Sequence, residues 1–378
     1  MNILIATDSF KDALPAFEVC DSLASGIEST FPEAHCRVFP LADGGEGTLA
    51  ILADVLGGEW VTVRCHDPLM RAIEASYLWV ASQQLAIVEM ARASGLELLK
   101  VDERDCLQTT TFGTGELIAD ALGKGAKKIV LTAGGSATND VGLGMALALG
   151  YTFYGKNGQS IIPKGQNLVE ITSVGTASVH PNLQSVDFWV ATDVKNPLYG
   201  INGAAYVYAP QKGADPSAVA LLDQGLASVA KLMANTFYKD VQDIEGSGAG
   251  GGIGAGAICF LNAQICSAAT WIFDTLQLDE AIQQTDLIIT GEGRIDSQSW
   301  QGKVLSVVWQ KAQYWQKPMI LVAGTLQDLD TIIQLPSVIY ATSILDKPVL
   351  LSEALASTAA LLYNKGQSLG KWLRYFHK

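Results

Sequence analysis

The sequence predicts an α/β protein of two domains, one of which contains a parallel sheet with helices on both faces. Five apolar runs are short, continuous and rich in β-branched residues, as buried parallel strands are. Each run leads through a polar or glycine-rich turn into a helical pattern, and strands that alternate with helices form parallel sheets. At 378 residues the chain has room for about two to three domains with sizeable cores. The five segments are residues 2–12, 36–48, 127–140, 286–296 and 318–328.

The expected sheet begins with a strand near residues 2–7. A helix follows that has one apolar stripe, formed by Phe17, Cys20, Ala24 and Ile27. Because the other runs follow the same strand–turn–helix order, we expect all five strands to lie in one Rossmann-like or flavodoxin-like sheet. The remaining strands are expected near residues 36–41, 128–133, 286–290 and 319–323.

Two regions interrupt this regular alternation. Residues 61–104 contain apolar segments that suggest a hairpin-rich unit, and residues 148–283 contain further strands and a glycine run. We expect these regions to form a second α/β domain, packed closely against the first because no long Pro/Ser linker separates them. The predicted division places residues 1–60, 105–147 and 284–378 in the Rossmann-like domain and residues 61–104 and 148–283 in the inserted domain.

Composition restricts the function classes. Hydrophobic residues make up 49% and charged residues 17%, which indicates a globular chain rather than a disordered one. The formal net charge of −13 argues against nucleic acid and anionic membrane surfaces as partners. The six cysteines are scattered, and neither a signal peptide nor a membrane-spanning apolar stretch is expected. These features predict a soluble cytoplasmic protein and leave the oligomeric state open, a homodimer included.

Polar residues gather where the predicted strands end. In parallel sheets, ligands bind beyond the carboxyl ends of the strands. Carboxylates at that edge can hold Mg²⁺, usually through one or two direct bonds plus waters, and glycine-rich turns beside them can hold phosphates. Together these features are typical of phosphoryl transfer. The polar residues concerned are Asp8, Lys11, Asp43, Glu46, Asn139, Asp140, Glu292 and Asp296.

Two glycine-rich segments are candidates for phosphate binding. Residues 131–145 link a strand to a helix and expose backbone N–H groups at the positive end of the helix dipole. The alternative is an ordinary helix cap in which Asn139 or Asp140 accepts hydrogen bonds from the first-turn amides. The run at 246–256 forms either a cradle of backbone amides or a flexible loop with close helix packing. As a dinucleotide fingerprint this run is weak, because a polar segment rather than a strand precedes it.

Asp193 and Lys11 are candidates for direct roles in chemistry. Asp193 follows a predicted strand and precedes an Asn-Pro turn, so it is an Asx-turn residue, a metal ligand or a general base. Lys11 either neutralises an anionic substrate or is a solvated surface lysine. The four histidines lie outside the glycine-rich segments, which leaves carboxylates at strand ends to accept a proton. Asp193 alone among them is expected in the inserted domain, facing the others across a cleft.

Nine motifs, in order along nearly the whole chain, resemble those of the bacterial type-I glycerate kinases. The resemblance implies a two-domain α/β fold with the active site in the cleft between the domains. It also implies transfer of the γ-phosphoryl group of ATP to a hydroxyl of D-glycerate, with 2-phosphoglycerate favoured over 3-phosphoglycerate. The motifs are DSFK (8–11), ADGGEGT (42–48), EMARASGL (89–96), FGTGELI (112–118), GGSATNDVGLGM (134–145), ATDVKNPLYG (191–200), PQKGA (210–214), GAGGGIGAG (248–256) and ITGEGRID (289–296), the last followed by Gly302-Lys303.

We assign expected roles on this basis. Asp193 is the first choice for accepting the proton of the attacking hydroxyl and Asp8 the second, while Lys11 neutralises an anionic group. Mg²⁺ is expected to bridge phosphate oxygens, with Glu46, Asp140, Glu292 and Asp296 as its ligands. The residues expected to bind substrate or phosphate are Ser9, Asp43, Gly44, Gly45, Gly134, Gly135, Ser136, Thr138, Asn139, Gly250, Gly251, Gly252 and Lys303.

The chain departs from the family pattern at two places, and other functions stay open. Asp12 and Ala13 stand where the family usually has a small pair such as Gly-Ser, and Ser299 and Trp300 replace a Thr-Leu-like pair. One alternative function is a kinase for another small hydroxy acid. Another is a nicotinamide-dependent dehydrogenase, and a third is a non-catalytic sensor of sugar acids.

Overall fold

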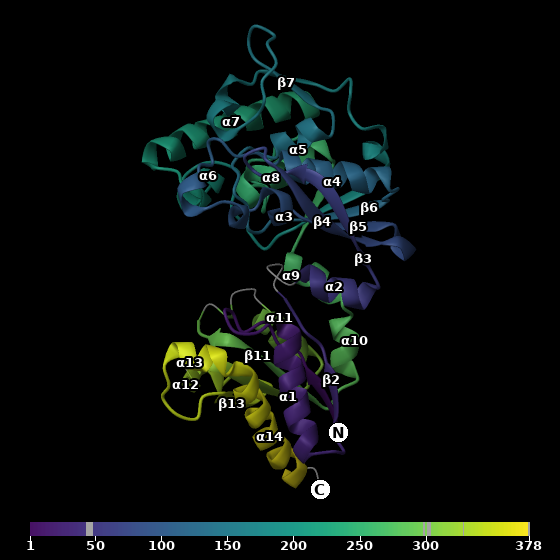
Figure 1. The fold of residues 1–378 in the computed structure, drawn as a ribbon, viewed down its shortest axis with the longest axis vertical. Coiled ribbons are helices and arrows are strands. Elements are labelled where there is room, and N and C mark those ends of the chain that lie inside the picture. The colour runs from purple at the N-terminus through teal and green to yellow at the C-terminus, as the bar shows by residue number, and fades with distance from the viewer. Residues whose placement is uncertain (43–47, 298, 301–303, 328, 377–378) are drawn as a thin grey trace. The chain divides into compact units, whose positions relative to one another are not determined.

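The computed structural model describes residues 1–42, 48–297, 299–300, 304–327 and 329–376. The chain divides into two compact units: unit 1 consists of Met1–Leu52 with Ala269–Lys378, and unit 2 of Ala53–Ala268. Each unit contains a sheet and helices, so the predicted α/β class is confirmed. The purple N-terminal and yellow C-terminal parts of the chain share unit 1, as Figure 1 shows, so this unit is discontinuous in sequence.

Unit 1 has, in its described part, a sheet of five strands in which every neighbouring pair is parallel. The central β1 pairs through Ile3 with Leu287 on one side and with Cys36 on the other. The strands in spatial order are β13 (Val338–Ser343), β12 (Met319–Leu326), β11 (Leu287–Ile295), β1 (Asn2–Ile5) and β2 (His35–Val38).

Both faces of this sheet are covered. Ile3 and Ile5 belong to one apolar cluster with residues of α1 (Ala16–Thr30) and α14 (Thr358–Phe376). Leu4 points to the opposite face, because successive strand residues alternate, and it is also fully buried. Sheets buried on both faces have continuous apolar strands, which explains the pattern of the sequence. The other helices of unit 1 are α10 (Leu278–Gln283), α11 (Val304–Tyr314), α12 (Leu329–Ile332) and α13 (Leu351–Ala356), while α2 (Thr48–Leu56) and α9 (Ala268–Thr275) cross the unit boundary.

Unit 2 has a mixed sheet, with six strands among the described residues. Its first two pairs are antiparallel hairpin partners, and the following three pairs are parallel. The strands in spatial order are β3 (Glu59–His66), β4 (Ala72–Val80), β5 (Leu85–Glu89), β6 (Lys128–Thr132), β9 (Asp187–Ala191) and β10 (Gln264–Cys266). The hairpin-rich region predicted at residues 61–104 therefore forms one edge of this sheet.

Helices and a small hairpin complete unit 2. A single large apolar cluster contains side chains from the sheet and from most of these helices, and it is the core of the unit. The helices are α3 (Ala91–Ser94), α4 (Phe112–Gly123), α5 (Leu143–Ala148), α6 (Ala204–Tyr208), α7 (Pro216–Phe237) and α8 (Ala249–Phe260), and the hairpin consists of β7 (Thr152–Tyr154) and β8 (Ser173–Gly175). Short 3-10 turns lie at Ala81–Gln83, Leu96–Leu98, Val101–Glu103, Gly165–Glu170, Pro181–Ser185 and Pro210–Lys212.

The predicted domain division needs a correction. A strand does lie at residues 128–132, as predicted, but it pairs with β5 and β9 of unit 2 rather than with the strands of unit 1. Residues 105–147 therefore belong to unit 2, which is a continuous insertion between residues 52 and 269. The physical reason is that an apolar β-branched run predicts a buried strand, whereas its neighbours are chosen by long-range packing.

Helix α7 is, among the described residues, the one helix long and apolar enough to cross a membrane. Its contacts within unit 2 argue against a membrane-spanning helix. Asp223 on this helix accepts a hydrogen bond from the backbone N–H of Gly200, at 2.7 Å. Leu222, Leu226 and Val229 are fully buried in the core of unit 2. The helix is therefore a core element of a globular unit, and core helices satisfy the same length and composition test.

Candidate active site

In unit 1, the DSFK and GEGRID motifs lie side by side because β1 and β11 are neighbours. Beyond the end of β1, the backbone N–H of Asp8 donates to the carbonyl of Gly291 at 3.0 Å. The backbone of Lys11 lies against Gly293, where a Cβ atom would be 3.4 Å from the Lys11 nitrogen. The Asp8 carboxylate accepts from the N–H of Ser9 at 2.6 Å. This edge of the sheet thus gathers Asp8, Ser9 and Lys11 beside β11.

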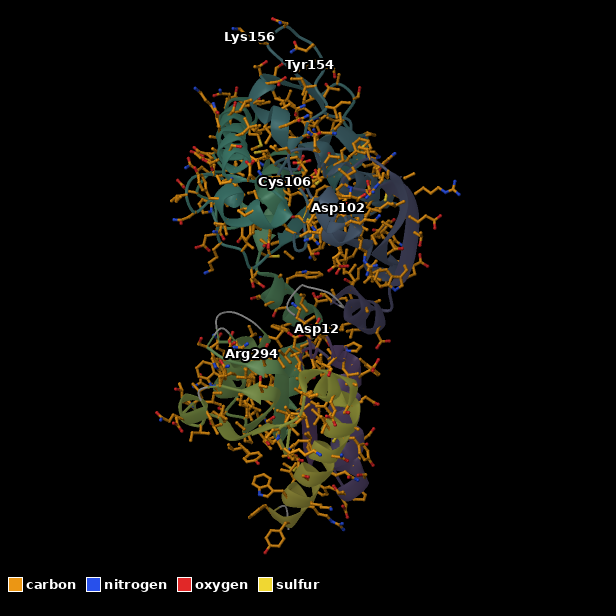
Figure 2. All side chains as sticks on the ribbon, turned by 60° about the vertical axis from the view of Figure 1, so that its left-hand side comes forward. Asp12, Asp102, Cys106, Tyr154, Lys156 and Arg294 are labelled. Atoms are coloured by element: carbon orange, nitrogen blue, oxygen red, sulfur yellow. The ribbon has the colours of Figure 1, made fainter. Side chains whose placement is uncertain are left out.

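At the same edge, the predicted site residue Asp296 forms an ion pair with Arg294, which the sequence analysis did not include in the site. Arg294 of β11 lies 3.2 Å from the carboxylate of Asp296, and its side chain is largely exposed (Figure 2). The N–H of Asp296 donates to the hydroxyl of Ser299 at 3.1 Å, and this hydroxyl donates to the carbonyl of Arg294. Ser299 therefore holds the turn that positions Asp296. Arg294 was visible in the GEGRID motif, but nothing in the sequence distinguished it from a solvated arginine.

Asp12, which stands where the family usually has a small residue, adopts a backbone conformation that glycine favours. Asp12 has a φ of 63°, in the left-handed region that glycine adopts most readily. Aspartate tolerates this region better than most residues do, because its short side chain can hydrogen-bond locally. Figure 2 labels Asp12 in the same unit as Arg294. The residue thus keeps the turn of residues 10–14, which two backbone hydrogen bonds between Phe10 and Leu14 close.

In unit 2, four parallel strands end in register. The last residues of β5, β6, β9 and β10 are paired partners: Glu89 with Thr132, Thr132 with Ala191, and Ala191 with Cys266. The loops that follow these strands therefore leave from one edge of the sheet. This is the edge at which parallel sheets bind ligands. Three of these loops carry motifs that the sequence singled out, at residues 89–96, 134–145 and 191–200.

The turn of residues 134–140 is held on one side by the EMARASGL motif. The N–H of Leu96 donates to the carbonyl of Gly135 at 2.9 Å, and the N–H of Ala137 donates to the carbonyl of Ser94 at the same distance. On another side, the hydroxyl of Thr109 donates to the carbonyl of Ala137 at 2.8 Å. Gly134 and Gly135 stay exposed. The turn is therefore a fixed structure with an open glycine surface.

The glycine run packs directly against this turn. Gly250, Gly251 and Gly252 all have left-handed backbones, with φ values of 59°, 74° and 94°. A Cβ atom at Gly251 would overlap the carbonyl oxygen of Thr138, and the N–H of Val141 donates to the carbonyl of Gly251 at 3.2 Å. Of the two alternatives for this run, close packing is confirmed, while anion binding by its amides stays a prediction.

Asp140 is fully buried and acts as a helix cap. Its carboxylate accepts from the N–H and hydroxyl of Thr111, at 2.8 and 2.9 Å, and from the N–H groups of Gly142 and Gly144, at 3.1 and 3.2 Å. Burial raises the pKa of this carboxyl, and the hydrogen bonds from Thr111 and the glycines oppose the rise. Both oxygens are used within the fold, so the capping alternative describes Asp140 better than the predicted metal ligand does.

We predict that Asp140→Asn lowers the free energy of unfolding by about 2 kcal/mol, because the NH₂ group that replaces one carboxylate oxygen then faces donors that have lost their acceptor. Urea denaturation measures this change. Asp102→Asn is the matched control, because Asp102 is an exposed acid of the same unit (Figure 2), and its stability should not change. If Asp140→Asn were as stable as the control, Asp140 would be free for another role.

Two buried side chains of the turn have unused polar atoms. The hydroxyl of Thr138 and both amide atoms of Asn139 have no hydrogen-bond partner within the described part of the chain, although both residues are fully buried. Such groups are rare in folded proteins, since each costs the free energy of its lost hydration. They indicate a place where a ligand or water completes the hydrogen bonding.

Asp193 lies at the end of β9 with its side chain exposed. Its carboxylate accepts from the hydroxyl of Ser267, which follows β10, at 2.7 Å. At the end of β5, which β6 separates from β9, Glu89 accepts from Arg92 at 2.8 Å, and Arg92 in turn stacks over Trp60 at 4.6 Å. Sequence reasoning missed Ser267, Glu89 and Arg92, although Glu89 and Arg92 belong to the quoted EMARASGL motif.

The predicted site residues thus fall into two groups. Asp193 shares unit 2 with Asp140, which corrects the expectation that it stands alone in its domain. Within the described residues, no group of three or more His, Cys, Asp or Glu side chains is arranged to hold a metal. Unit 1 carries Asp8, Ser9, Lys11, Glu292 and Asp296, and unit 2 carries Gly134, Gly135, Ser136, Thr138, Asn139, Asp140, Asp193, Gly250, Gly251 and Gly252. Asp43, Gly44, Gly45, Glu46 and Lys303 lie outside the described residues.

Comparison with known proteins decides the family. The sequence model described as the glycerate kinase family matches residues 3–374. The chain belongs to the glycerate kinase family. It is 43% identical to the glycerate 2-kinase of Escherichia coli over 332 residues, which are 87% of this chain and 86% of that protein. It is 41% identical to the glycerate kinase of Halalkalibacterium halodurans over 324 residues, 86% of this chain and 85% of that one.

The fold agrees with that of a solved family structure. A Salmonella typhimurium LT2 protein assigned as glycerate kinase 2 matches with a TM-score of 0.88 and 37% identity. The match covers 100% of this chain and 99% of that one. The resemblance drawn from the nine motifs is therefore confirmed. Membership in this family makes the chain an enzyme, a phosphotransferase with an alcohol group as acceptor.

Proposed function

We propose that this protein transfers the γ-phosphoryl group of ATP to the 2-hydroxyl of D-glycerate and so forms 2-phosphoglycerate. The observation that carries this proposal is the family match over nearly the whole chain, with relatives named glycerate kinase or glycerate 2-kinase at about 40% identity. The nine motifs quoted from the sequence supply the residues. A cytoplasmic location and the absence of nucleic-acid and membrane partners belong to the same proposal, supported by the net charge of −13.

In the proposed mechanism, unit 2 binds the phosphates of the nucleotide. The exposed backbone of Gly134 and Gly135 allows phosphate oxygens to approach N–H groups closely. Anion binding by the amides of Gly250, Gly251 and Gly252, which pack against this turn, is part of the same proposal. Asp193 at the neighbouring strand end accepts the proton of the attacking hydroxyl. Asp8 is the second choice for this role. Lys11 neutralises negative charge, which is the main requirement in phosphoryl transfer.

The residues present fit a magnesium ion. Mg²⁺ keeps several waters and is bound through one or two carboxylates plus substrate phosphates, so it needs no three-carboxylate cluster. Glu292 and Asp8 are half-buried on adjoining segments of unit 1, where the Asp8 N–H donates to Gly291. Asp296 lies further along the same motif. Mg²⁺ held there would neutralise charge on the transferring phosphoryl group.

We predict that removal of divalent metal with excess EDTA lowers turnover at least tenfold, and that added MgCl₂ restores it. The rate of ADP release measures turnover both in EDTA and after MgCl₂ is added. The melting temperature should stay nearly constant, because the described carboxylates of unit 1 have partners within the fold. Full turnover in EDTA would contradict a role for metal.

A panel of parallel assays tests the reaction class. The proposal predicts ADP release that depends on D-glycerate and no change in NADH absorbance with NAD⁺ and glycerate. ADP release with another hydroxy acid and none with D-glycerate would identify a kinase of different specificity. Oxidation of glycerate with NAD⁺ would identify a dehydrogenase. Binding of glycerate without any turnover would identify a sensor.

A further inference from the structure

Lys212 is a buried lysine that the proposed mechanism does not use. It ends the 3-10 turn Pro210–Lys212 of the PQKGA motif and is only 2% exposed. Its ammonium group donates to the hydroxyl of Ser136 at 2.7 Å and to the carbonyl oxygen of Thr138 at 2.8 Å. Both acceptors belong to the turn of residues 134–140. The lysine therefore holds this turn from beneath.

The charge of Lys212 has no ion-pair partner among the described residues. Its two acceptors are uncharged, and an ammonium group has three donors. Burial lowers the pKa of Lys212 to about 8, while negative charge at Cys106 and Asp140 opposes the decrease. Burial raises the pKa of the Cys106 thiol (Figure 2) to about 11, so this group is neutral at pH 7. The carboxylate of Asp140 makes its hydrogen bonds to Thr111 and the helix cap, so it acts on Lys212 through its charge and forms no ion pair with it in the described part of the chain.

A buried cation without a partner destabilises a fold unless an anion approaches it. The groups beside Lys212 suit such an anion. The unpartnered hydroxyl of Thr138 and amide of Asn139 belong to the turn that the lysine holds, and the glycines at 250–252 lie against that turn. Unit 2 thus has, at one turn, a buried positive charge, two unused polar side chains and the exposed glycine backbone of residues 134 and 135.

We propose that Lys212 is a positioning residue for nucleotide phosphates. It holds the turn of residues 134–140 in the conformation that binds phosphate. Its positive charge compensates the negative charge of phosphate oxygens bound on the other side of that turn. The inference rests on the proposed function, in which this turn binds the phosphates of ATP. The ammonium group acts through the turn rather than on the reacting atoms, because it is buried beneath Ser136 and Thr138.

Three substitutions at Lys212 separate its charge from its hydrogen bonds. Lys212→Met removes both, Lys212→Gln keeps a donor without the charge, and Lys212→Arg keeps the charge. Lys239→Met is the matched control, because Lys239 also donates to a carbonyl and a side-chain oxygen in unit 2, at Ile258 and Asn262, near the end of α8 and outside the quoted motifs. The measurements are kcat, the KM for ATP, the KM for D-glycerate and the rise in melting temperature caused by ADP.

Lys212→Met should raise the KM for ATP roughly tenfold to a hundredfold, the range expected for losing hydrogen bonds to a charged donor. The KM for D-glycerate should change less than about twofold. At the same ADP concentration, the rise in melting temperature should be smaller than in the wild type, since this rise reports binding to the folded state. Lys212→Arg should bind ADP more tightly than Lys212→Gln, and Lys239→Met should match the wild type in both KM values.

Other results would overturn the inference. An unchanged KM for ATP would mean that Lys212 is only structural. A rise confined to the KM for D-glycerate would place the substrate carboxylate, rather than the nucleotide, at this turn. If Lys212→Met does not fold, ADP binding by Lys212→Arg and Lys212→Gln is compared instead. Equal ADP binding by these two variants would contradict a role for the charge of Lys212. A wild type that binds ADP but does not phosphorylate glycerate would contradict the proposed function alone.

Discussion

Replacing Asp193 by asparagine should lower kcat about a hundredfold and leave the melting temperature unchanged. The side chain is exposed at the end of β9, and the oxygen of an asparagine can still accept from Ser267. The substitution therefore removes a base and a charge while it keeps the local hydrogen bond. Loss of a general base typically costs a hundredfold to ten-thousandfold in rate. The loose transition state of phosphoryl transfer needs less help from a base, so the low end of that range is expected.

Asp187→Asn is the control for this experiment, because Asp187 is an exposed aspartate at the other end of the same strand. It should retain wild-type kcat. Steady-state ADP release measures both variants, and thermal denaturation checks the fold. If Asp193→Asn turned over normally, Asp8 would become the candidate base. A large fall in its melting temperature would instead identify Asp193 as a structural Asx-turn residue.

Gly135→Val should reduce kcat/KM for ATP on the order of a thousandfold. Gly135 is exposed, has a φ of 70°, and a Cβ atom there would lie 3.1 Å from the Cβ of Ala91. A branched side chain would cover the backbone surface on which phosphate is expected to bind. It would also strain the left-handed backbone and shift the turn that Leu96 and Ala137 hold.

Gly125→Val is the control that separates strain of a left-handed backbone from blocking of the phosphate-binding surface. Gly125 also has a left-handed backbone, with a φ of 94°, and it lies before β6 with open space around its Cβ position. Both variants should lose similar stability, about 1–2 kcal/mol from the backbone alone. Only Gly135→Val should lose ATP use. Equal activities would mean that the turn of residues 134–140 is an ordinary helix cap.

The positions of five strands could be predicted from the sequence, but not which strands share a sheet, and β13 was not predicted. The run at residues 128–133 was correctly predicted as a buried strand, because continuous β-branched runs have few other uses. Its neighbours were predicted wrongly, since β6 lies between β5 and β9 in unit 2. An apolar strand with two buried faces fits any parallel sheet, so its partners depend on contacts far along the chain.

The turns of the site were predictable, but the direction of each polar side chain was not. Asn139 and Asp140 are neighbours of similar shape, and no sequence pattern indicates that Asp140 alone should contact Thr111 and the first-turn amides. Lys212 did leave a signal, as a single charge inside the apolar segment around PQKGA. Its importance depends on a contact with Ser136, 76 residues away in the chain, which no local pattern records.

Phosphorus NMR of the reaction products tests whether this protein phosphorylates the 2-hydroxyl of D-glycerate. ATP, MgCl₂ and D-glycerate are incubated with the protein, and each component is omitted in turn. We expect the γ-phosphate signal of ATP to be replaced by the signals of ADP and 2-phosphoglycerate only in the complete mixture. Formation of 3-phosphoglycerate would contradict the proposed acceptor hydroxyl, and an unchanged ATP spectrum in the complete mixture would contradict the proposed reaction itself.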